Sequence, residues 1–180
     1  MESEAKRKFR FVRHKRNLGK GAAIRSGIRH AQGDYILIQD ADLEYDPRDI
    51  SKLLEVVEKS QAPVVYGSRF IGKTQDSVFL HREANFVLTF ITNILYGSSL
   101  SDMETCYKLI RADILHSIQL RAQHFEFEPE VTAKLLRSKV PIIEVRISYT
   151  KRGYSEGKKI NFFDFFEAVW TLVKFRLPWI

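Results

Sequence analysis

The chain has 180 residues, a length that suits one domain with a hydrophobic core of its own. Apolar residues make up 44% of it and charged residues 28%, which excludes a disordered chain. The formal charge of +7 indicates anionic partners, and nucleic acid, anionic lipid headgroups and phosphorylated substrates all fit.

The only cysteine, Cys106, excludes an intrachain disulfide and indicates a reducing compartment. It lies in an apolar stretch, so we expect it to be a packed core thiol. The N-terminus has a basic start but no apolar segment of the signal-peptide kind. No run reaches the ~18 apolar residues that a membrane-spanning helix needs.

Strands and helices alternate in the first part of the chain, which predicts a parallel sheet with crossover helices. An i, i+3, i+4, i+7 apolar pattern predicts that the second helix faces a core. The expected order is a strand at residues 9–12, a helix at about 21–31, a strand at 35–39, a helix at about 47–59 and a strand at 63–67.

The pattern changes after Ser68, where a polar loop at residues 69–82 begins. The expected elements are then a helix at about 83–96, a strand at 106–111, a helix near 112–117, a helix from 128 to about 138, a strand at 141–149 and a final helix at 160–176. No repeat and no interdomain linker is visible. We expect an α/β fold with a mixed, mostly parallel sheet and helices on both faces, formed by residues 1–160, and an amphipathic aromatic helix at 161–180.

Two carboxylates, Asp40 and Asp42, directly follow the apolar run at residues 35–38. Ligands of open α/β sheets bind beyond the carboxyl ends of the strands, and a carboxylate pair there suits a hard divalent cation that holds substrate phosphates. Asp46 and Pro47 already supply a cap and a first turn for the next helix, so the pair is not needed for that. This arrangement favours chemistry on a nucleotide-activated substrate.

Other interpretations of the pair are an Asx-turn or solvated loop carboxylates. A phosphatase-type nucleophilic aspartate is disfavoured because Glu44 stands two residues beyond Asp42, where threonine or valine is typical. Glu44 is instead a third candidate metal ligand, because alternate residues of an extended segment face the same way.

Three basic positions are candidates for binding phosphate. Arg69 follows the strand expected at residues 63–67, where it could clamp a phosphate or form a surface ion pair. Arg152 and Lys158 lie in a loop at 151–159 that also holds two glycines. This loop could close over a diphosphate, or its charges could form a solvated face.

Three acidic residues further along have weaker signals. Asp102 could position a substrate, act as a base or cap a loop. Glu128 and Glu130 flank a proline at a helix start, where the helix dipole alone explains carboxylates.

The final helix has an apolar stripe that suits either a membrane interface or core packing. The stripe consists of Phe162, Phe166, Val169, Trp170 and Val173.

Six segments occur in the same order as motifs of family 2 glycosyltransferases with the GT-A fold, and the chain resembles this family over about residues 9–170. The resemblance is strongest to the dolichyl- or undecaprenyl-phosphate glucosyl- and mannosyltransferases. DMETCYK together with EGKKI is far more specific than the D-x-D pair. The segments are NLGKGAA (17–23), QDADLEYDP (39–47), YGSRF (66–70), DMETCYK (102–108), FEPE (127–130) and YSEGKKI (154–160).

This resemblance implies a Rossmann-like GT-A enzyme that moves a hexose from a UDP- or GDP-linked donor to a polyprenyl phosphate, with inversion and with Mg²⁺ or Mn²⁺. It implies that Asp40 and Asp42 bind the metal and the donor diphosphate and that Glu44 assists the metal. The implied catalytic residues are Asp42 and Asp102, the latter in the acceptor-side motif. The implied substrate-binding residues are Lys20, Asp40, Arg69, Arg152 and Lys158.

The implied location is the cytoplasmic, inner face of a membrane, with peripheral attachment and a possible homo-oligomer. A nucleic-acid partner is disfavoured because the basic residues do not gather with aromatic ones into a recognisable module. A phosphate acceptor is already anionic at neutral pH and needs no general base, whereas a sugar hydroxyl would need one, with Asp102 as the first candidate.

The resemblance has one departure. Members of the family begin with a V-I-P-x-Y-N-E-like strand and a second strand that ends in D-D-x-S, and nothing here matches either. We therefore expect a chain that lacks roughly the first 50 residues of a full domain. A second hypothesis follows, in which the chain is a non-catalytic remnant that binds a membrane surface or a partner through its basic, aromatic tail.

Overall fold

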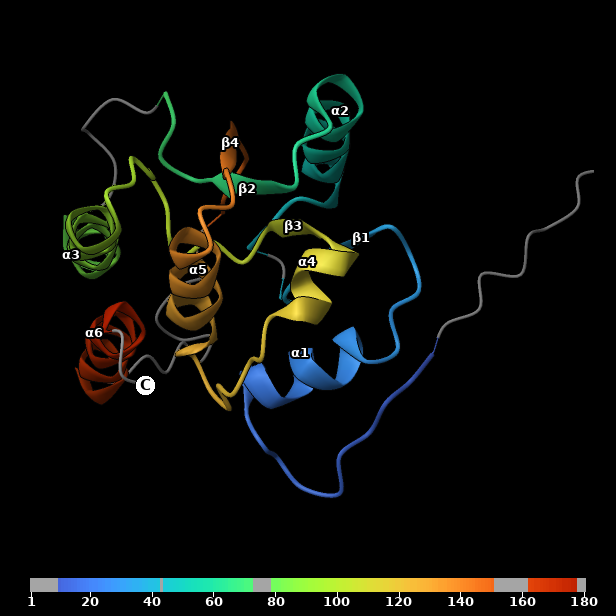
Figure 1. Cartoon of the computed structure of the whole chain (residues 1–180), viewed down its shortest axis with the longest axis horizontal. Coiled ribbons are helices and arrows are strands. Elements are labelled where there is room, and N and C mark those ends of the chain that lie inside the picture. Colours follow the sequence, from blue (N-terminus) through green and yellow to red (C-terminus); the bar gives the residue numbers. More distant parts are fainter. Residues whose placement is uncertain (1–9, 43, 73–78, 151–161, 178–180) are drawn as a thin grey trace, which may run out of the picture.

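Figure 1 shows the computed structural model of the chain, which describes residues 10–42, 44–72, 79–150 and 162–177. Four strands form one sheet in the order β1-β3-β2-β4. β3 is antiparallel to both β1 and β2, and β4 is parallel to β2. β1, β2 and β4 therefore point the same way, and the sheet is mixed, as expected, although only the β2–β4 pairing is parallel. The strands are β1 Tyr35–Ile38, β2 Val64–Ser68, β3 Lys108–Arg111 and β4 Ile143–Arg146.

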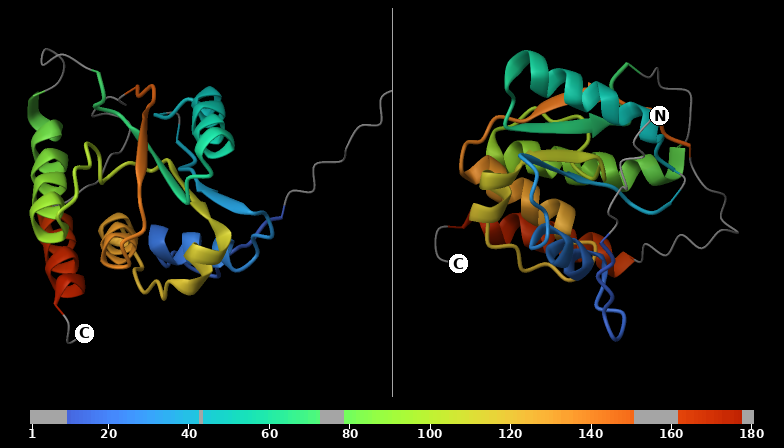
Figure 2. Two further views of the ribbon diagram at one scale, coloured as in Figure 1. Left: turned by 45° about the horizontal axis from the view of Figure 1, so that its top comes forward. Right: turned by 90° about the vertical axis from the view of Figure 1, so that its right-hand side faces the viewer.

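Helices cover both faces of the sheet, as expected (Figure 2). α2 (Ile50–Ser60) lies on one face. On the other face are α1 (Lys20–Ile28), α4 (Ala112–Ser117) and α5 (Phe127–Arg137). α3 (Phe79–Tyr96) and α6 (Phe162–Arg176) lie side by side beyond α5.

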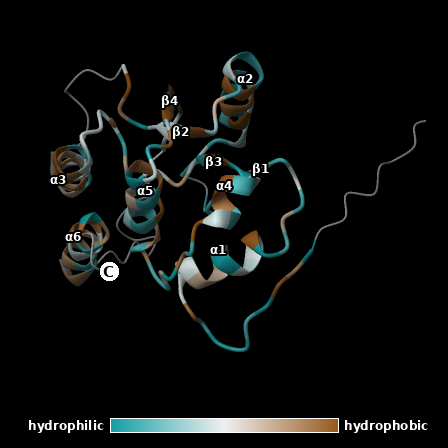
Figure 3. Cartoon of the chain, viewed as in Figure 1, coloured by the Kyte–Doolittle hydropathy of each residue, from teal (hydrophilic) through white to brown (hydrophobic). Residues whose placement is uncertain are grey.

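The buried apolar residues form two clusters. The larger one fills the space between the sheet and its helices, and Val64, Ile110 and Leu135 in it have no exposed surface. The smaller one joins α3, α5 and α6 through residues such as Met103 and Leu172. Hydrophobic residues dominate α3 and much of α6 in Figure 3. Over the described residues, no helix has the length and apolar character needed to cross a bilayer.

Local chemistry fixes two features that matter for the site. Asp46 accepts a hydrogen bond from the Arg48 N–H, and Pro47 begins the 3₁₀ turn η1 (Pro47–Asp49) that leads into α2. This confirms the predicted cap. Gly67 in β2 has no room for a side chain, because a Cβ there would lie 2.8 Å from a methyl group of Ile147.

Most predicted elements are present, with shifted ends. α3 begins four residues before the expected start, and β4 covers only the middle of the strand expected at 141–149. The prediction of a strand at 9–12 is wrong over residues 10–12, which form no strand. Apolar residues alone do not make a strand without a neighbour to pair with, and Phe11 is 93% exposed.

Candidate active site

Four chain segments meet at one edge of the sheet. β1, β2 and β4 all end there, because they point the same way. β3 runs in the opposite direction and begins there, with Lys108 paired to Ile38 and to Tyr66. The segments after β1, β2 and β4 therefore lie beside the turn that precedes β3. Asp40, Arg69 and Asp102 all belong to these segments.

Asp40 is joined to two helices by Lys20, the first residue of α1. The Lys20 Nζ lies 2.8 Å from Asp40 Oδ2 and 2.7 Å from Oε1 of Glu128, in the first turn of α5. Burial by itself would lower the pKa of Lys20, but Glu128, Cys106 and Asp40 outweigh it and raise that pKa. Lys20 therefore stays charged and ties the first aspartate of D-x-D to α5.

Cys106 also contacts the loop that carries Asp40. It is buried, as expected for a core thiol, and its Sγ accepts a hydrogen bond from the Asp40 N–H at 3.0 Å. Its own N–H donates to the Tyr45 hydroxyl at 3.1 Å. Burial raises the pKa of the thiol to about 12, so Cys106 remains protonated and unreactive at neutral pH.

Asp42 and Glu44 have different surroundings. Asp42 is half-buried, and its Oδ1 accepts the Glu44 N–H at 3.2 Å, as in an Asx-turn. Glu44 is buried, and its Oε2 accepts a hydrogen bond from the Tyr149 hydroxyl at 3.1 Å. The Thr150 N–H donates to the Glu44 carbonyl. Glu44 thus connects the D-x-D loop to the segment that follows β4.

Arg69 and Asp102 form a buried, two-pronged ion pair. Arg69 Nε and Nη2 each lie 2.7 Å from one oxygen of Asp102, and the Arg69 N–H donates to the same carboxylate. The guanidinium also stacks over the rings of Phe70 and Tyr149. Burial would lower the pKa of Arg69, but Asp102 outweighs it and raises that pKa. A carboxylate held by both oxygens in this way is poorly placed to act as a base.

Glu144 and Lys108 hold the turn that carries Asp102. Glu144 on β4 accepts hydrogen bonds from the N–H groups of Ser101 and Asp102 at 2.8 and 3.0 Å. Lys108 is fully buried, donates to the carbonyls of Met103 and Thr105, and lies over the Tyr66 ring. Burial lowers the pKa of Lys108.

The structure thus brings together Lys20, Asp40, Asp42 and Glu44 at one side of the edge and Arg69 with Asp102 at the other. Arg152 and Lys158 lie outside the described residues. Glu130 accepts the N–H groups of Arg121 and Ala122, which agrees with its structural interpretation. Sequence reasoning missed the Lys20–Glu128 ion pair, because α1 and α5 are far apart in the chain. Their proximity leaves no local signal.

Within the described ranges, no three His, Cys, Asp or Glu side chains are grouped to hold a metal ion. Asp40 and Asp42 nevertheless fit a divalent cation of the Mg²⁺ or Mn²⁺ type, because two half-buried carboxylates at a strand end present hard oxygen ligands. Mg²⁺ typically uses one or two protein carboxylates and completes its shell with substrate phosphates and water.

Carboxylates and a buried arginine at the carboxyl ends of strands that point the same way are typical of α/β proteins that bind a ligand at this edge of the sheet. Comparison with protein-family models gives the family: residues 2–119 match the model for glycosyl transferase family 2. The chain belongs to this family.

The chain is similar to curated sugar transferases, two of which are named for a polyprenyl phosphate. A dodecaprenyl-phosphate galacturonate synthase of Rhizobium johnstonii is 28% identical over 83% of this chain. A dolichol-phosphate mannosyltransferase of Pyrococcus furiosus is 24% identical over 97% of it. The low-salt glycan biosynthesis hexosyltransferase Agl6 of Haloferax volcanii is 29% identical over 88% of it. The matched regions are 44%, 51% and 38% of these relatives, so the chain spans about half of their length or less.

Solved structures confirm the fold. Glucosyl-3-phosphoglycerate synthase from Mycobacterium tuberculosis, in complex with Mn²⁺, UDP-glucose and phosphoglyceric acid, has a TM-score of 0.63 at 14% identity and covers 88% of this chain and 55% of its own. Mannosyl-3-phosphoglycerate synthase from Rubrobacter xylanophilus has a TM-score of 0.62 at 15% identity, with 89% and 50% covered. Both likenesses identify the α/β architecture as GT-A.

Proposed function

We propose that this chain carries the catalytic centre of an enzyme that transfers a hexose from a UDP- or GDP-linked donor to a polyprenyl phosphate, with inversion at the anomeric carbon. One observation carries the proposal. The carboxylates of Asp40 and Asp42 and the buried Arg69–Asp102 ion pair lie at the same edge of the sheet. The names of the relatives support a lipid phosphate as acceptor.

The donor diphosphate would bind beside Asp40 and Asp42. A divalent cation held there would neutralise charge on the departing diphosphate. Lys20 lies against Asp40 and offers its ammonium group to the same phosphates. Arg152 and Lys158 would add positive charge from the loop at 151–159.

The acceptor would need no general base. The second pKa of a phosphate monoester is about 6, so its oxygen is already anionic at neutral pH. In an inverting step this oxygen attacks the anomeric carbon from the side opposite the diphosphate, and the carbon–diphosphate bond breaks as the new bond forms. Asp102 takes Nε and Nη2 of Arg69 and so fixes the orientation of the guanidinium, whose remaining N–H groups would contact the acceptor phosphate.

The test is transfer of radiolabelled hexose from UDP-glucose or GDP-mannose into an organic-extractable polyprenyl phosphate product. We expect transfer that requires Mg²⁺ or Mn²⁺ and falls at least a hundredfold in Asp42→Asn. The matched control is Asp113→Asn, which changes an exposed carboxylate on α4. Near-normal transfer by Asp42→Asn, or none by the unaltered chain with any donor, would contradict the proposal.

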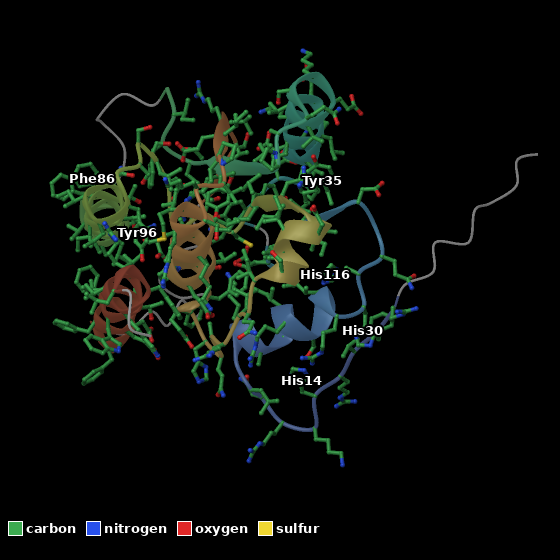
Figure 4. All side chains as sticks on the ribbon, viewed as in Figure 1. His14, His30, Tyr35, Phe86, Tyr96 and His116 are labelled. Atoms are coloured by element: carbon green, nitrogen blue, oxygen red, sulfur yellow. The ribbon has the colours of Figure 1, made fainter. Side chains whose placement is uncertain are left out.

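A second candidate function, binding to a membrane surface, is favoured by one specific observation. α3 and α6 pack side by side (Figure 1). Large apolar side chains on both helices are exposed. Tyr96 points from α3 toward α6 and donates to the Leu172 carbonyl, whereas Phe86 points outward (Figure 4). The exposed set is Phe86, Phe90 and Ile94 on α3, and Phe163, Phe166 and Trp170 on α6.

The two functions are compatible, because an enzyme that acts on a polyprenyl phosphate must approach a bilayer. We propose peripheral attachment at the cytoplasmic face of the membrane, with the exposed α3–α6 surface facing the lipid. Apolar faces with aromatic residues and basic ends are typical of helices that lie in a membrane interface, and Lys174 and Arg176 stand at such an end of α6.

A further inference from the structure

Glu104 differs from the other acidic residues of the edge in how its carboxyl group is placed. Its Oε1 is sealed from solvent and has no hydrogen-bond partner anywhere in the described part of the chain. The residue as a whole remains partly exposed. A buried polar atom without a partner costs free energy in the unliganded chain, so its persistence calls for an explanation.

Glu104 lies in the turn between the two halves of the site, because Asp102, two residues before it, binds Arg69, and Cys106, two residues after it, accepts the Asp40 N–H. The groups that act on it electrostatically are Glu128 of α5, Lys108 of β3, and Arg69 with Asp102. Glu128 is in turn linked through Lys20 to Asp40. Glu104 therefore stands between the expected diphosphate side of the site and the expected acceptor side. A hexose bonded to the diphosphate and facing the acceptor would lie in this region.

Lys108 is a cation that acts on Glu104, but its ammonium group already has other partners. Its ammonium group donates to the carbonyls of Met103 and Thr105, on either side of Glu104. Burial first, and then the charge of Glu128, raises the pKa of Glu104 to about 7. At neutral pH the group thus exists both as a carboxylic acid and as a carboxylate.

A hydroxyl group matches both states, because it can donate to a carboxylate and accept from a carboxylic acid. A phosphate oxygen matches only the protonated state and is repelled by the ionised one. A carbohydrate hydroxyl is therefore the ligand whose chemistry fits this position.

We infer that Glu104 binds a hydroxyl group of the donor hexose and thereby helps to select which sugar is transferred. The inference rests on the proposed function, because it assumes that a nucleotide-linked hexose occupies the edge. It adds a sugar-specificity residue to a site whose other groups act on phosphate.

The test compares nucleoside diphosphates with nucleotide-sugars, measured by calorimetry with Mn²⁺ present. The probes are UDP with UDP-glucose, and GDP with GDP-mannose. We expect Glu104→Ala to leave the affinity for the free diphosphate within twofold and to weaken the nucleotide-sugar about tenfold to hundredfold. Glu104→Gln, which keeps a partner for a hydroxyl, should lose less. Glu55→Gln, on the exposed side of α2, is the matched control.

Deoxy analogues of the donor sharpen the test. A donor that lacks the contacted hydroxyl should bind wild type and Glu104→Ala equally well. The free chain should also melt at a higher temperature in both variants at neutral pH, because Glu104→Ala removes an unsatisfied buried oxygen and Glu104→Gln removes a buried charge. A higher melting temperature would show that lost binding is not lost folding.

Two results would overturn the inference. Equal weakening of the diphosphate and the nucleotide-sugar by Glu104→Ala, or no weakening of either, would remove the sugar contact while leaving the proposed function intact. Failure of the unaltered chain to bind any of the four probes would overturn the proposed function, and the inference with it.

Discussion

At the scale of single residues, the acidic side chains of the edge fall into paired and unpaired groups. Asp102 gives both oxygens to Arg69, and Glu144 accepts from the N–H groups of the same turn. Glu104, two residues after Asp102, has one buried oxygen without a hydrogen-bond partner among the described residues. Paired carboxylates fix geometry, whereas an unmatched one stores a free-energy cost that a ligand can remove.

This cost predicts a pH dependence of stability. The folded pKa of Glu104 is about 7, above the value of 4.5 expected without burial, so the folded chain binds the proton more tightly. The stabilisation from protonated Glu104 is complete below about pH 4.5 and is lost as the pH rises to about 7. Glu104→Gln cannot ionise. It should match wild type near pH 4.5 and exceed it by about 1–3 kcal/mol at pH 8.

Urea unfolding of both proteins at several pH values measures this difference. Because both carry the same remaining groups, the subtraction cancels the pH dependence of Glu128, Lys108, Arg69 and Asp102. A difference that stays constant from pH 4.5 to 8 would show that the Glu104 pKa is not raised.

At the scale of elements, the turn between α3 and β3 connects the strands that form the site. The end of β2 reaches it through Arg69, and β4 reaches it through Glu144. Asp102 is fully buried, and Arg69 is the cation that pairs directly with its charge. The stability of the chain should therefore fall strongly when either Asp102 or Arg69 is changed.

We expect Asp102→Asn to destabilise the chain by about 3–5 kcal/mol, because it leaves the Arg69 charge buried without an anionic partner. The double variant Asp102→Asn with Arg69→Met should lose less than the sum of the two single changes. Urea midpoints provide the measurement, and Asp113→Asn, which breaks an exposed pair with Arg111, should leave the midpoint nearly unchanged. Strict additivity of the two changes at Asp102 and Arg69 would contradict the coupling.

How much of this could be predicted from sequence depends on the range of each signal. The cap at Asp46, the short helix α4 and the place of Asp40 and Asp42 after β1 follow from neighbouring residues, and all are confirmed. The bond between Arg69 and Asp102 spans 33 residues, and nothing in the sequence pattern marks it. Both residues were candidates, but their pairing depends on which strands are neighbours.

The direction of β3 could not be predicted from the sequence either. An apolar run predicts a buried strand in either orientation, and here β3 runs against β1 and β2. This reversal places the turn at residues 102–107 at the same edge as Asp40 and Arg69. Without it, the DMETCYK segment would lie at the opposite end of the sheet. Glu104 therefore reaches the site through topology, and no local pattern could have identified it.

At the scale of the whole molecule, the site and the exposed apolar surface belong to neighbouring layers. The sheet edge holds the charged groups, and α5 separates the sheet from the α3–α6 pair (Figure 1). Met103, next to Asp102, packs into the cluster formed with α3 and α6. The turn that holds Arg69 is thus continuous with the layer that we expect to face the lipid, which suits an acceptor with a charged head and an apolar chain.

This arrangement predicts which side chains hold the protein at a bilayer. Phe166 and Trp170 are about half exposed on α6, whereas Leu172 on the same helix is fully buried. Changing both exposed residues to serine should leave folding intact and lower the partition coefficient onto vesicles of anionic phospholipid at least tenfold, because each aromatic ring contributes apolar area. Co-sedimentation with vesicles gives the coefficient. The matched control is Leu54→Ser, at an exposed apolar position of α2 on the other face of the sheet. An equal loss in the control, or undiminished partition of the α6 variant, would show that this surface does not face the membrane.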